Sequence, residues 1–396
     1  MDPLRNVEFK KHHAILLSVQ RRGFDTSLIV GKSMLDGAVK KEVCNRISLF
    51  QTNNLRGFRN PKPSLLPREI VSVTKLLNNI APDFVFVTGL WVVAPLVVGL
   101  YRLGKSISRQ DKHVTRFMVY TDVDGREFIS GKFKYVWRLM LYLNYLCCDM
   151  IMVQTECAKS VVSKYLGSDR KVAIIPVGYS SQIFRPTSYL ASVREPIILS
   201  VARVTHQKGM DILIKAFAKI HRDFPAWTLR LVGPLDDEGY YSKLLDIIDS
   251  EGIKEKVHFS NRVTEERLVA EYLRASVFCL YSNWEGSPAS RVEASAMGLP
   301  LVISSAGCGD SWKSMGALVG PRGDIEWLAY ALSDMMRDEG LRIAASKRLQ
   351  THILSWDEVV SRMFSSLGRS HNTVPNEPNS GPSGRAFDDD SRILGG

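Results

Sequence analysis

Two glutamates, Glu285 and Glu293, stand eight positions apart in the segment YSNWEGSPASRVEASAMGLPLVIS. The first ends a loop after an apolar run, and the second lies inside a helical pattern that begins near Pro288, about two turns beyond the first. Carboxylates in these positions could hold different hydroxyl groups of one ligand, and the backbone N–H groups at the helix start would face an anion. The bland alternative is that Glu293 pairs with Arg291 or a lysine on a solvated face. The apolar neighbours count against it, because a buried carboxylate needs a partner.

A second loop, within SVARVTHQKG, contains Arg203 and Lys208 five positions apart. It joins an apolar strand pattern to a helix that begins near Gly209, and such a loop is a common anion site. An Arg fork and a Lys point charge would together suit a diphosphate. Taken alone, the loop is better interpreted as a basic cap on a strand.

The elements around these loops predict an α/β fold. Apolar runs of strand length alternate with helical patterns, which favours parallel sheets with helices on both faces. The alternation restarts after a Pro-rich and Gly-rich linker, so we expect two doubly wound, Rossmann-like domains with a hinge near residues 186–195. The predicted boundaries are residues 1–187, residues 188–355, a C-terminal helix over 356–369 that packs back on the first domain, and a disordered tail over 370–396.

Composition excludes several classes of protein. The 396 residues are 45% hydrophobic and 23% charged, as in ordinary globular chains. The six cysteines form no CxxC pair, so we expect neither a metal site nor a disulfide framework. This cysteine usage favours a reducing compartment. The start of the chain does not resemble a signal peptide. The apolar stretch 84–104 is long enough to span a membrane, but Thr88-Gly89 and Pro95 favour a strand, a turn and a helix instead.

Charge differs between the two halves of the chain. Residues 1–187 hold 28 Lys and Arg against 14 Asp and Glu, whereas residues 188–396 have a net charge of −3, within a total of +11. A basic first half would suit anionic lipid, acidic glycan or nucleic acid, and a solvated surface without a partner fits equally well. No motif of aromatic and basic residues indicates nucleic-acid binding, so we exclude nucleic acid as a partner. The helical pattern 133–146 mixes basic and aromatic residues, so contact with an anionic membrane stays open beside plain core packing.

These motifs together resemble glycosyltransferase family 4, whose members are retaining enzymes of the GT-B fold. Glu285 and Glu293 match its E-x7-E motif, and Arg203 with Lys208-Gly209 matches its basic loop. LRLVGP, IIPVGYSSQIFRP and SSAGCGDSWKSMGALVGPRGD resemble three further landmarks in the same order. The resemblance covers residues 7–367, although the first half matches only in its pattern.

The resemblance implies a role for each matching position. Arg203 and Lys208 would hold the donor diphosphate, Glu285 would orient the transferred sugar, and Glu293 would hold the nucleotide ribose. The remaining donor-binding candidates are Gly233, Val263, Gly286, Ser287, Pro288 and Ala289. The family's N-domain His is missing, and Asp122 or Asp124 in YTDVDGRE takes its place as the catalytic candidate of the first domain.

Two departures from the family pattern affect the prediction. EGSP replaces the usual EGFG, so the turn that faces the sugar differs. The chain also enters its first helix directly after MDPLRNVEF, so the first strand of the N-terminal domain is absent from the pattern. Either the true start lies upstream or this domain is trimmed.

The expected activity is transfer of a hexosyl group from a nucleotide-diphosphate sugar to a glycan or lipid-linked acceptor, with retention and without metal or cofactor. The alternative is a non-catalytic or degenerate GT-B sugar-nucleotide-binding protein. A phosphorylase would need a pyridoxal-phosphate lysine and a longer chain, and an epimerase lacks the combined Arg–Lys and E-x7-E set. The expected location is the cytoplasm, with peripheral contact at the inner face of the membrane left open.

Overall fold

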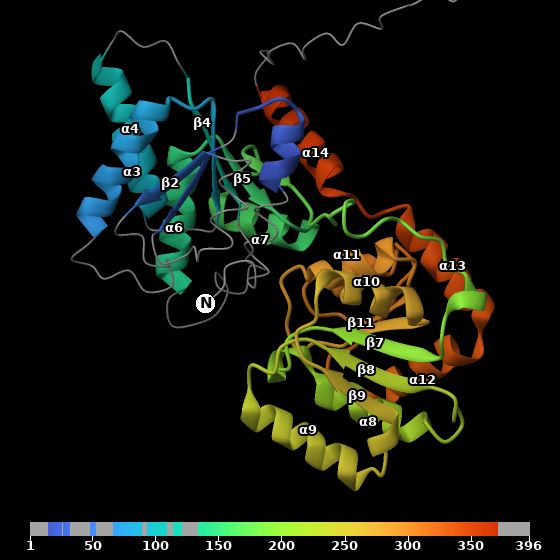
Figure 1. The fold of residues 1–396 in the computed structure, drawn as a ribbon. Helices are drawn as coiled ribbons and strands as arrows, with labels where there is room; N and C mark the ends of the chain where they lie inside the picture. Colours follow the sequence, from blue (N-terminus) through green and yellow to red (C-terminus); the bar gives the residue numbers. More distant parts are fainter. Residues whose placement is uncertain are drawn as a thin grey trace, which may run out of the picture.

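The computed structural model describes residues 15–25, 27–31, 48–52, 66–88, 93–108, 114–120 and 134–370. Within these ranges the chain forms two lobes joined by the linker that follows β6 and by the C-terminal helix α14 (Figure 1). Both lobes have parallel sheets. The predicted α/β class with two doubly wound units is therefore confirmed.

Lobe 1 contains a four-stranded sheet in the order β3-β4-β5-β6. Its strands are β3 (Phe84–Thr88), β4 (Arg116–Tyr120), β5 (Met150–Val153) and β6 (Val172–Ile174). The labelled helices are α3 (Leu66–Ile80), α4 (Val93–Ser108), α6 (Lys134–Cys147) and α7 (Glu156–Leu166). The stretch 84–104 is thus a strand and a helix, as its Gly and Pro predict. In the described ranges no helix has the length and apolarity that crossing a bilayer requires.

A second sheet in lobe 1 has two parallel strands, β1 (Ser27–Gly31) and β2 (Ser48–Thr52). A helix over residues 15–21 precedes β1. Within the described part of the chain, no pairing joins β1 to β3, so the strands of this lobe form two separate sheets. The start of the predicted first helix lies outside the described residues, as does the segment before it.

Lobe 2 contains a six-stranded sheet in the order β12-β11-β10-β7-β8-β9. Its strands are β7 (Ile197–Val201), β8 (Thr228–Val232), β9 (Val257–Ser260), β10 (Val277–Leu280), β11 (Leu301–Ser304) and β12 (Leu318–Gly320). Its α-helices are α8 (Met210–Ile220), α9 (Glu238–Ser250), α10 (Glu265–Arg274), α11 (Ala289–Ala296), α12 (Ile325–Arg337) and α13 (Glu339–Gln350). The chain proceeds from β7 to β8 on one side and later to β10 on the other. The strand order therefore reverses between β7 and β10, and ligands of such sheets bind at the carboxyl ends of the strands there.

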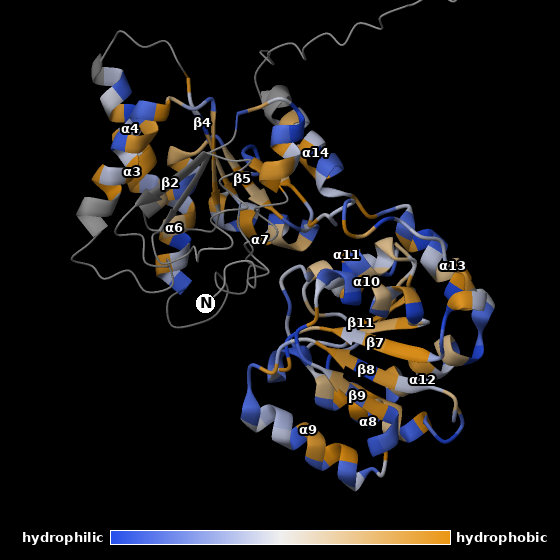
Figure 2. Cartoon of the chain, viewed as in Figure 1, coloured by the Kyte–Doolittle hydropathy of each residue, from blue (hydrophilic) through white to orange (hydrophobic). Residues whose placement is uncertain are grey.

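Burial explains why these elements form where the sequence predicts them. Every residue of β10 and β11 is buried, as expected for strands covered on both faces. Figure 2 shows the labelled strands of lobe 2 mostly in the hydrophobic colour. The helices that cover the sheet bury one side only: Leu213 and Phe217 of α8 are inside, whereas Lys219 is half exposed. Helix α13 was not predicted, and its weak apolar periodicity leaves little signal to detect.

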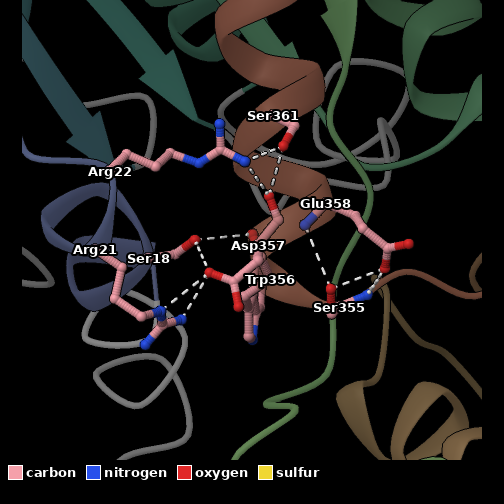
Figure 3. Close-up of polar contacts among 8 residues, drawn as sticks. All are labelled: Ser18, Arg21, Arg22, Ser355, Trp356, Asp357, Glu358 and Ser361. Carbon is pink, nitrogen blue, oxygen red and sulfur yellow. Dashed lines mark hydrogen bonds and ion pairs between the residues drawn. The ribbon is translucent and has the colours of Figure 1, made fainter. Parts of the chain in front are cut away.

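Helix α14 (Trp356–Ser370) returns to lobe 1 and lies against the helix over residues 15–21 (Figure 3). Asp357 Oδ1 accepts hydrogen bonds from Ser18 Oγ at 2.5 Å and from Arg21 Nη2 at 2.7 Å. The Phe364 ring stacks on Phe24, with ring centroids 5.0 Å apart. These contacts hold α14 on lobe 1, although the helices that precede it in sequence belong to lobe 2.

Candidate functional site

Two loops at the carboxyl ends of β7 and β10 are joined by hydrogen bonds. The Asn283 backbone N–H donates to the Gln207 carbonyl at 2.9 Å, and its side-chain amide donates to the His206 carbonyl at 2.7 Å. The Gln207 side-chain amide donates to the Trp284 carbonyl at 3.1 Å. Because β7 and β10 are neighbours in the sheet, the loops that contain Lys208 and Glu285 meet, as their implied roles on one donor require.

The centre of this contact is an ion pair between Lys208 Nζ and Glu285 Oε1, 2.5 Å apart. The side chains are only 13% and 4% exposed. Ser282 Oγ donates to the same carboxylate oxygen at 2.6 Å. Burial lowers the pKa of Lys208, and the Glu285 carboxylate opposes that shift. A buried pair of this kind is costly to break, because removing one partner leaves the other charge uncompensated.

Two arginines add positive charge around this pair, which we call the Lys208–Glu285 site. Arg203 is exposed and donates through Nη2 to the Gln207 side chain at 3.2 Å. Arg291 is fully buried, and its Nη2 donates to the Ala306 carbonyl at 3.3 Å. Its Nε and Nη1 have no hydrogen-bond partner within the described structure. Burial lowers the pKa of Arg291 to about 10, although the Glu285 charge opposes the shift.

The sequence alone does not indicate this role of Arg291, which is considered there only as a partner for Glu293 on a solvated face. The structure instead places three cations, Arg203, Lys208 and Arg291, near one buried carboxylate. The local charge is positive, which suits an anionic ligand such as a diphosphate.

Helix α11 begins immediately after this loop. Pro288 is its N-cap residue, and no side chain caps the helix. The candidates Gly286, Ser287 and Ala289 are half-buried beside that helix start. Their backbone is therefore next to the positive end of the helix dipole, one loop away from Lys208.

Glu293 lies in the middle of α11 and is half-buried. Its Oε2 accepts a hydrogen bond from the Tyr272 hydroxyl at 3.0 Å. Tyr272 comes from α10 and is fully buried, and burial followed by the Glu293 charge raises its phenol pKa well above the usual value. The partner that the sequence analysis required for Glu293 is thus a tyrosine hydroxyl.

The loop after β11 forms one wall of the Lys208–Glu285 site. Gly307 has a φ of +60°, and a Cβ added there would lie 2.6 Å from Glu285 Cβ and 2.5 Å from the Gly286 carbonyl oxygen. A side chain at Gly309 would lie 2.1 Å from the Ser304 carbonyl oxygen. Neighbouring backbone atoms approach both positions so closely that each requires glycine.

Gly233 directly follows β8, and Val263 lies in the loop between the neighbouring strand β9 and α10. The Gly233 backbone N–H donates to the Ser260 carbonyl at 2.9 Å, and the residue has a φ of +149°. Val263 is half-buried just before α10 and packs against the main hydrophobic core. The structure explains Gly233 by packing, since a Cβ there would lie 2.0 Å from the Ala202 carbonyl oxygen.

We expect Gly233→Ala to lower the free energy of unfolding by about 2–4 kcal/mol, through overpacking and backbone strain. The measurement is the midpoint of urea unfolding. Gly239→Ala is the matched control, because its added Cβ would approach no atom closer than 3.7 Å, and it should leave the midpoint nearly unchanged. A wild-type midpoint for Gly233→Ala would contradict the packing explanation.

Asp122 and Asp124, the catalytic candidates of the first domain, lie outside the described residues. The described ranges hold no group of three or more His, Cys, Asp or Glu side chains that could bind a metal ion. The described part of the site therefore consists of the Lys208–Glu285 pair, its two arginines, the start of α11, and Glu293 with Tyr272.

Comparison with known proteins identifies the kind of fold first. The structure is similar to a sucrose-phosphate synthase from Thermosynechococcus elongatus, with a TM-score of 0.70 and 16% identity, over 92% of this chain and 93% of the other. It is also similar to Anabaena HepE, solved in complex with UDP and glucose, with a TM-score of 0.67 and 15% identity, over 90% and 95% of the two chains. These likenesses confirm the GT-B fold.

Sequence comparison then gives a family match for part of the chain. Residues 184–351 match the family described as glycosyl transferases group 1. An uncharacterized glycosyltransferase of Haemophilus influenzae is 25% identical, over 72% of this chain and 73% of its own length. An MMP alpha-(1->4)-mannosyltransferase of Mycolicibacterium hassiacum is 30% identical over 54% of this chain, and the chain spans 52% of it. Residues 184–351 therefore resemble the group 1 glycosyltransferases, and the resemblance to family 4 fits these relatives.

Proposed function

We propose that this chain transfers a hexosyl group from a nucleoside diphosphate sugar to a glycan or lipid-linked acceptor, with retention of configuration. The observation that supports this most is the ion pair between Lys208 Nζ and Glu285 Oε1 at the strand-order reversal, 2.5 Å apart and almost fully buried. A cation and a carboxylate held there can receive a diphosphate and a sugar hydroxyl side by side. The names of the relatives agree, since one is a mannosyltransferase and another a mannosylfructose-phosphate synthase.

The proposed reaction breaks the bond between the anomeric carbon and the diphosphate. Negative charge then grows on the leaving phosphate, where Lys208, Arg203 and the uncapped start of α11 would stabilise it. Because these groups supply the positive charge, the proposal needs neither a metal ion nor a cofactor. Attack by the acceptor hydroxyl on the face that the phosphate leaves would retain configuration, and the donor phosphate would accept the acceptor's proton. Asp122 stays the candidate from lobe 1.

The remaining donor contacts follow from position. Glu285 would accept hydrogen bonds from sugar hydroxyl groups, while Glu293 would hold the ribose, oriented by the Tyr272 hydroxyl. The backbone between Gly286 and Ala289 would contact the phosphates. UDP and glucose are bound by Anabaena HepE, which supports a nucleotide-sugar donor for this chain.

A non-catalytic sugar-nucleotide-binding protein is the alternative, and one experiment separates the two. The purified chain is heated with UDP-, GDP- and ADP-sugars, because a ligand that binds the folded state raises Tm by mass action. One donor should raise Tm, and that donor should then be consumed when acceptor or water is supplied. A Tm that no donor changes would overturn the proposal, while binding without any turnover would favour the non-catalytic alternative.

We further propose that the acceptor is presented at an anionic membrane surface, which lobe 1 contacts. Helix α4 exposes three leucines at helical spacing, and the neighbouring α6 exposes an apolar stripe with the same periodicity. These side chains are Leu96, Leu100, Leu103, Tyr135, Leu139, Tyr142 and Leu146. Lys105, Lys134 and Arg138 lie on the same two helices, so apolar and basic groups occur together, as in helices that lie at lipid interfaces.

We expect the chain to co-sediment with vesicles that contain anionic lipid, and to do so less as salt increases. Leu139→Glu should reduce the bound fraction several-fold, because it puts a carboxylate on the apolar stripe. Tyr330→Glu is the matched control, since Tyr330 is 68% exposed but belongs to lobe 2. Equal sedimentation of both variants, or no sedimentation at any salt concentration, would refute the membrane contact.

A further inference from the structure

Two cysteines from opposite lobes meet beside the Lys208–Glu285 site. Cys157 lies in the first turn of α7 in lobe 1, and Cys308 lies in the loop after β11 in lobe 2. They are 151 positions apart in sequence, yet their Cα atoms are 6.1 Å apart and a disulfide joins them. That Cα separation is normal for a disulfide. Thr155, the N-cap residue of α7, also has its Oγ1 3.4 Å from Cys308 Sγ.

The backbone of Cys308 is held in an unusual conformation. Its φ is +56° and its ψ is +31°, in the left-handed region that side chains other than glycine rarely adopt. In the described part of the chain, Ala81 is the one other such residue. Cys308 stands between Gly307 and Gly309, which are themselves required by close contacts. Glycine would adopt this backbone conformation at a lower free energy than the cysteine that occupies the position.

The same loop connects the cysteine pair to the site. Gly307 packs so closely on Glu285 that an added Cβ would lie 2.6 Å from Glu285 Cβ. Its neighbour Cys308 is bonded to lobe 1. The Lys208–Glu285 site therefore faces the boundary between the lobes, and a bond between Cys157 and Cys308 fixes the width of that boundary.

We propose that Cys157 and Cys308 form a reversible thiol-oxidation site that locks the two lobes together over a bound donor. In the reduced form the lobes separate and donor exchanges. In the oxidised form the S–S bond holds the two lobes together.

The chemistry requires a small-molecule disulfide, such as glutathione disulfide, as the oxidant. The exposed Cys157 thiolate attacks one sulfur of that disulfide and releases the first small thiol. The half-buried Cys308 thiolate then attacks the mixed disulfide at Cys157, which forms the protein S–S bond and releases the second small thiol. Two protein thiols lose two electrons and two protons, and the oxidant gains them as two thiols.

The other described cysteines are poor candidates for this exchange. Cys148 and Cys279 are buried, and burial raises the pKa of the Cys148 thiol to about 12. Cys147 is half-buried and free, so it serves as a matched control. The sequence predicts a reducing compartment and no disulfide framework, and a single switchable bond differs from a framework that stabilises the fold.

The first test uses the full chain, reduced with dithiothreitol or oxidised with glutathione disulfide. Peptide mass mapping should find a Cys157–Cys308 cross-link in the oxidised wild type and in Cys147→Ser, but not in Cys157→Ser or Cys308→Gly. Small-angle X-ray scattering should give a smaller radius of gyration on oxidation for the wild type and for Cys147→Ser, but not for Cys157→Ser or Cys308→Gly. Cys308→Gly keeps the test interpretable, because glycine suits the backbone of residue 308 and the variant should fold. Absence of the cross-link, or a cross-link without compaction, would overturn the proposal.

The second test measures the release of a bound donor, so it rests on the proposed function. Release of a bound donor should slow at least tenfold on oxidation of the wild type, and should not change for Cys308→Gly. Release at the reduced rate from cross-linked protein would overturn the lock. If no donor binds to the reduced chain, the proposed function fails instead, and the cross-link and scattering results decide the lock independently.

Discussion

Lys208→Ala should lower turnover by ~10²–10³-fold, because it removes a cation that touches developing negative charge on the leaving diphosphate. The structure adds a second expectation, since Lys208 is the ion-pair partner of the buried Glu285. Leaving that carboxylate unpaired should lower the free energy of unfolding by about 3–5 kcal/mol. Steady-state kinetics with the donor identified by thermal shift measures the first effect, and urea unfolding the second.

The control for Lys208→Ala is Lys219→Ala. Lys219 Nζ also pairs with a carboxylate, that of Glu326 at 2.8 Å, but the two side chains are 49% and 77% exposed. An exposed pair contributes little to stability, and this one is on α8 and α12 away from the loops of the site. Kinetics should therefore be unchanged. If Lys208→Ala retained both wild-type turnover and wild-type donor affinity, the assignment of Lys208 would be wrong.

Glu285→Gln should lower turnover by about 10²-fold while keeping the size of the side chain and its ability to accept from Ser282. It should also change the pH profile. Burial lowers the pKa of Lys208 and the Glu285 carboxylate raises it, so neutralising Glu285 lowers the Lys208 pKa further. Turnover requires charged Lys208, and it should therefore fall with rising pH at a lower pH in Glu285→Gln than in the wild type.

Glu271→Gln is the matched control for that change. Glu271 and Glu285 are equally buried, at 3% exposure, and Glu271 accepts two hydrogen bonds from Arg230 at 2.8 and 2.7 Å. Replacing it should destabilise the fold without altering the pH profile of turnover. If turnover of Glu285→Gln fell with rising pH at the same pH as in the wild type, Glu285 would not control the charge of Lys208.

Much of lobe 2 could be predicted from sequence because local patterns determine it. The strands β7, β8, β10 and β11 form where the sequence has short apolar runs between turn residues. Parallel order then brings the loops after β7 and β10 together, which made the meeting of Lys208 and Glu285 predictable.

Other contacts could not be predicted, because they join elements distant in sequence. The Tyr272 hydroxyl reaches Glu293 from a different helix, and nothing in the helical pattern of α11 indicates that Arg291 points inward. The bond between Cys157 and Cys308 depends on how two lobes sit together. No spacing rule indicates such a pair, and the six cysteines show no regular arrangement.

The most direct test of the central claim is the affinity of the chain for nucleoside diphosphates, measured by calorimetry with wild type and Lys208→Ala. We expect one of UDP, GDP or ADP to bind the wild type well, and to bind Lys208→Ala at least tenfold more weakly, which is about 1.4 kcal/mol. The matching nucleoside without phosphates should bind both proteins equally. A diphosphate that bound both proteins with the same Kd, or bound neither, would contradict a donor site built on Lys208 and Glu285.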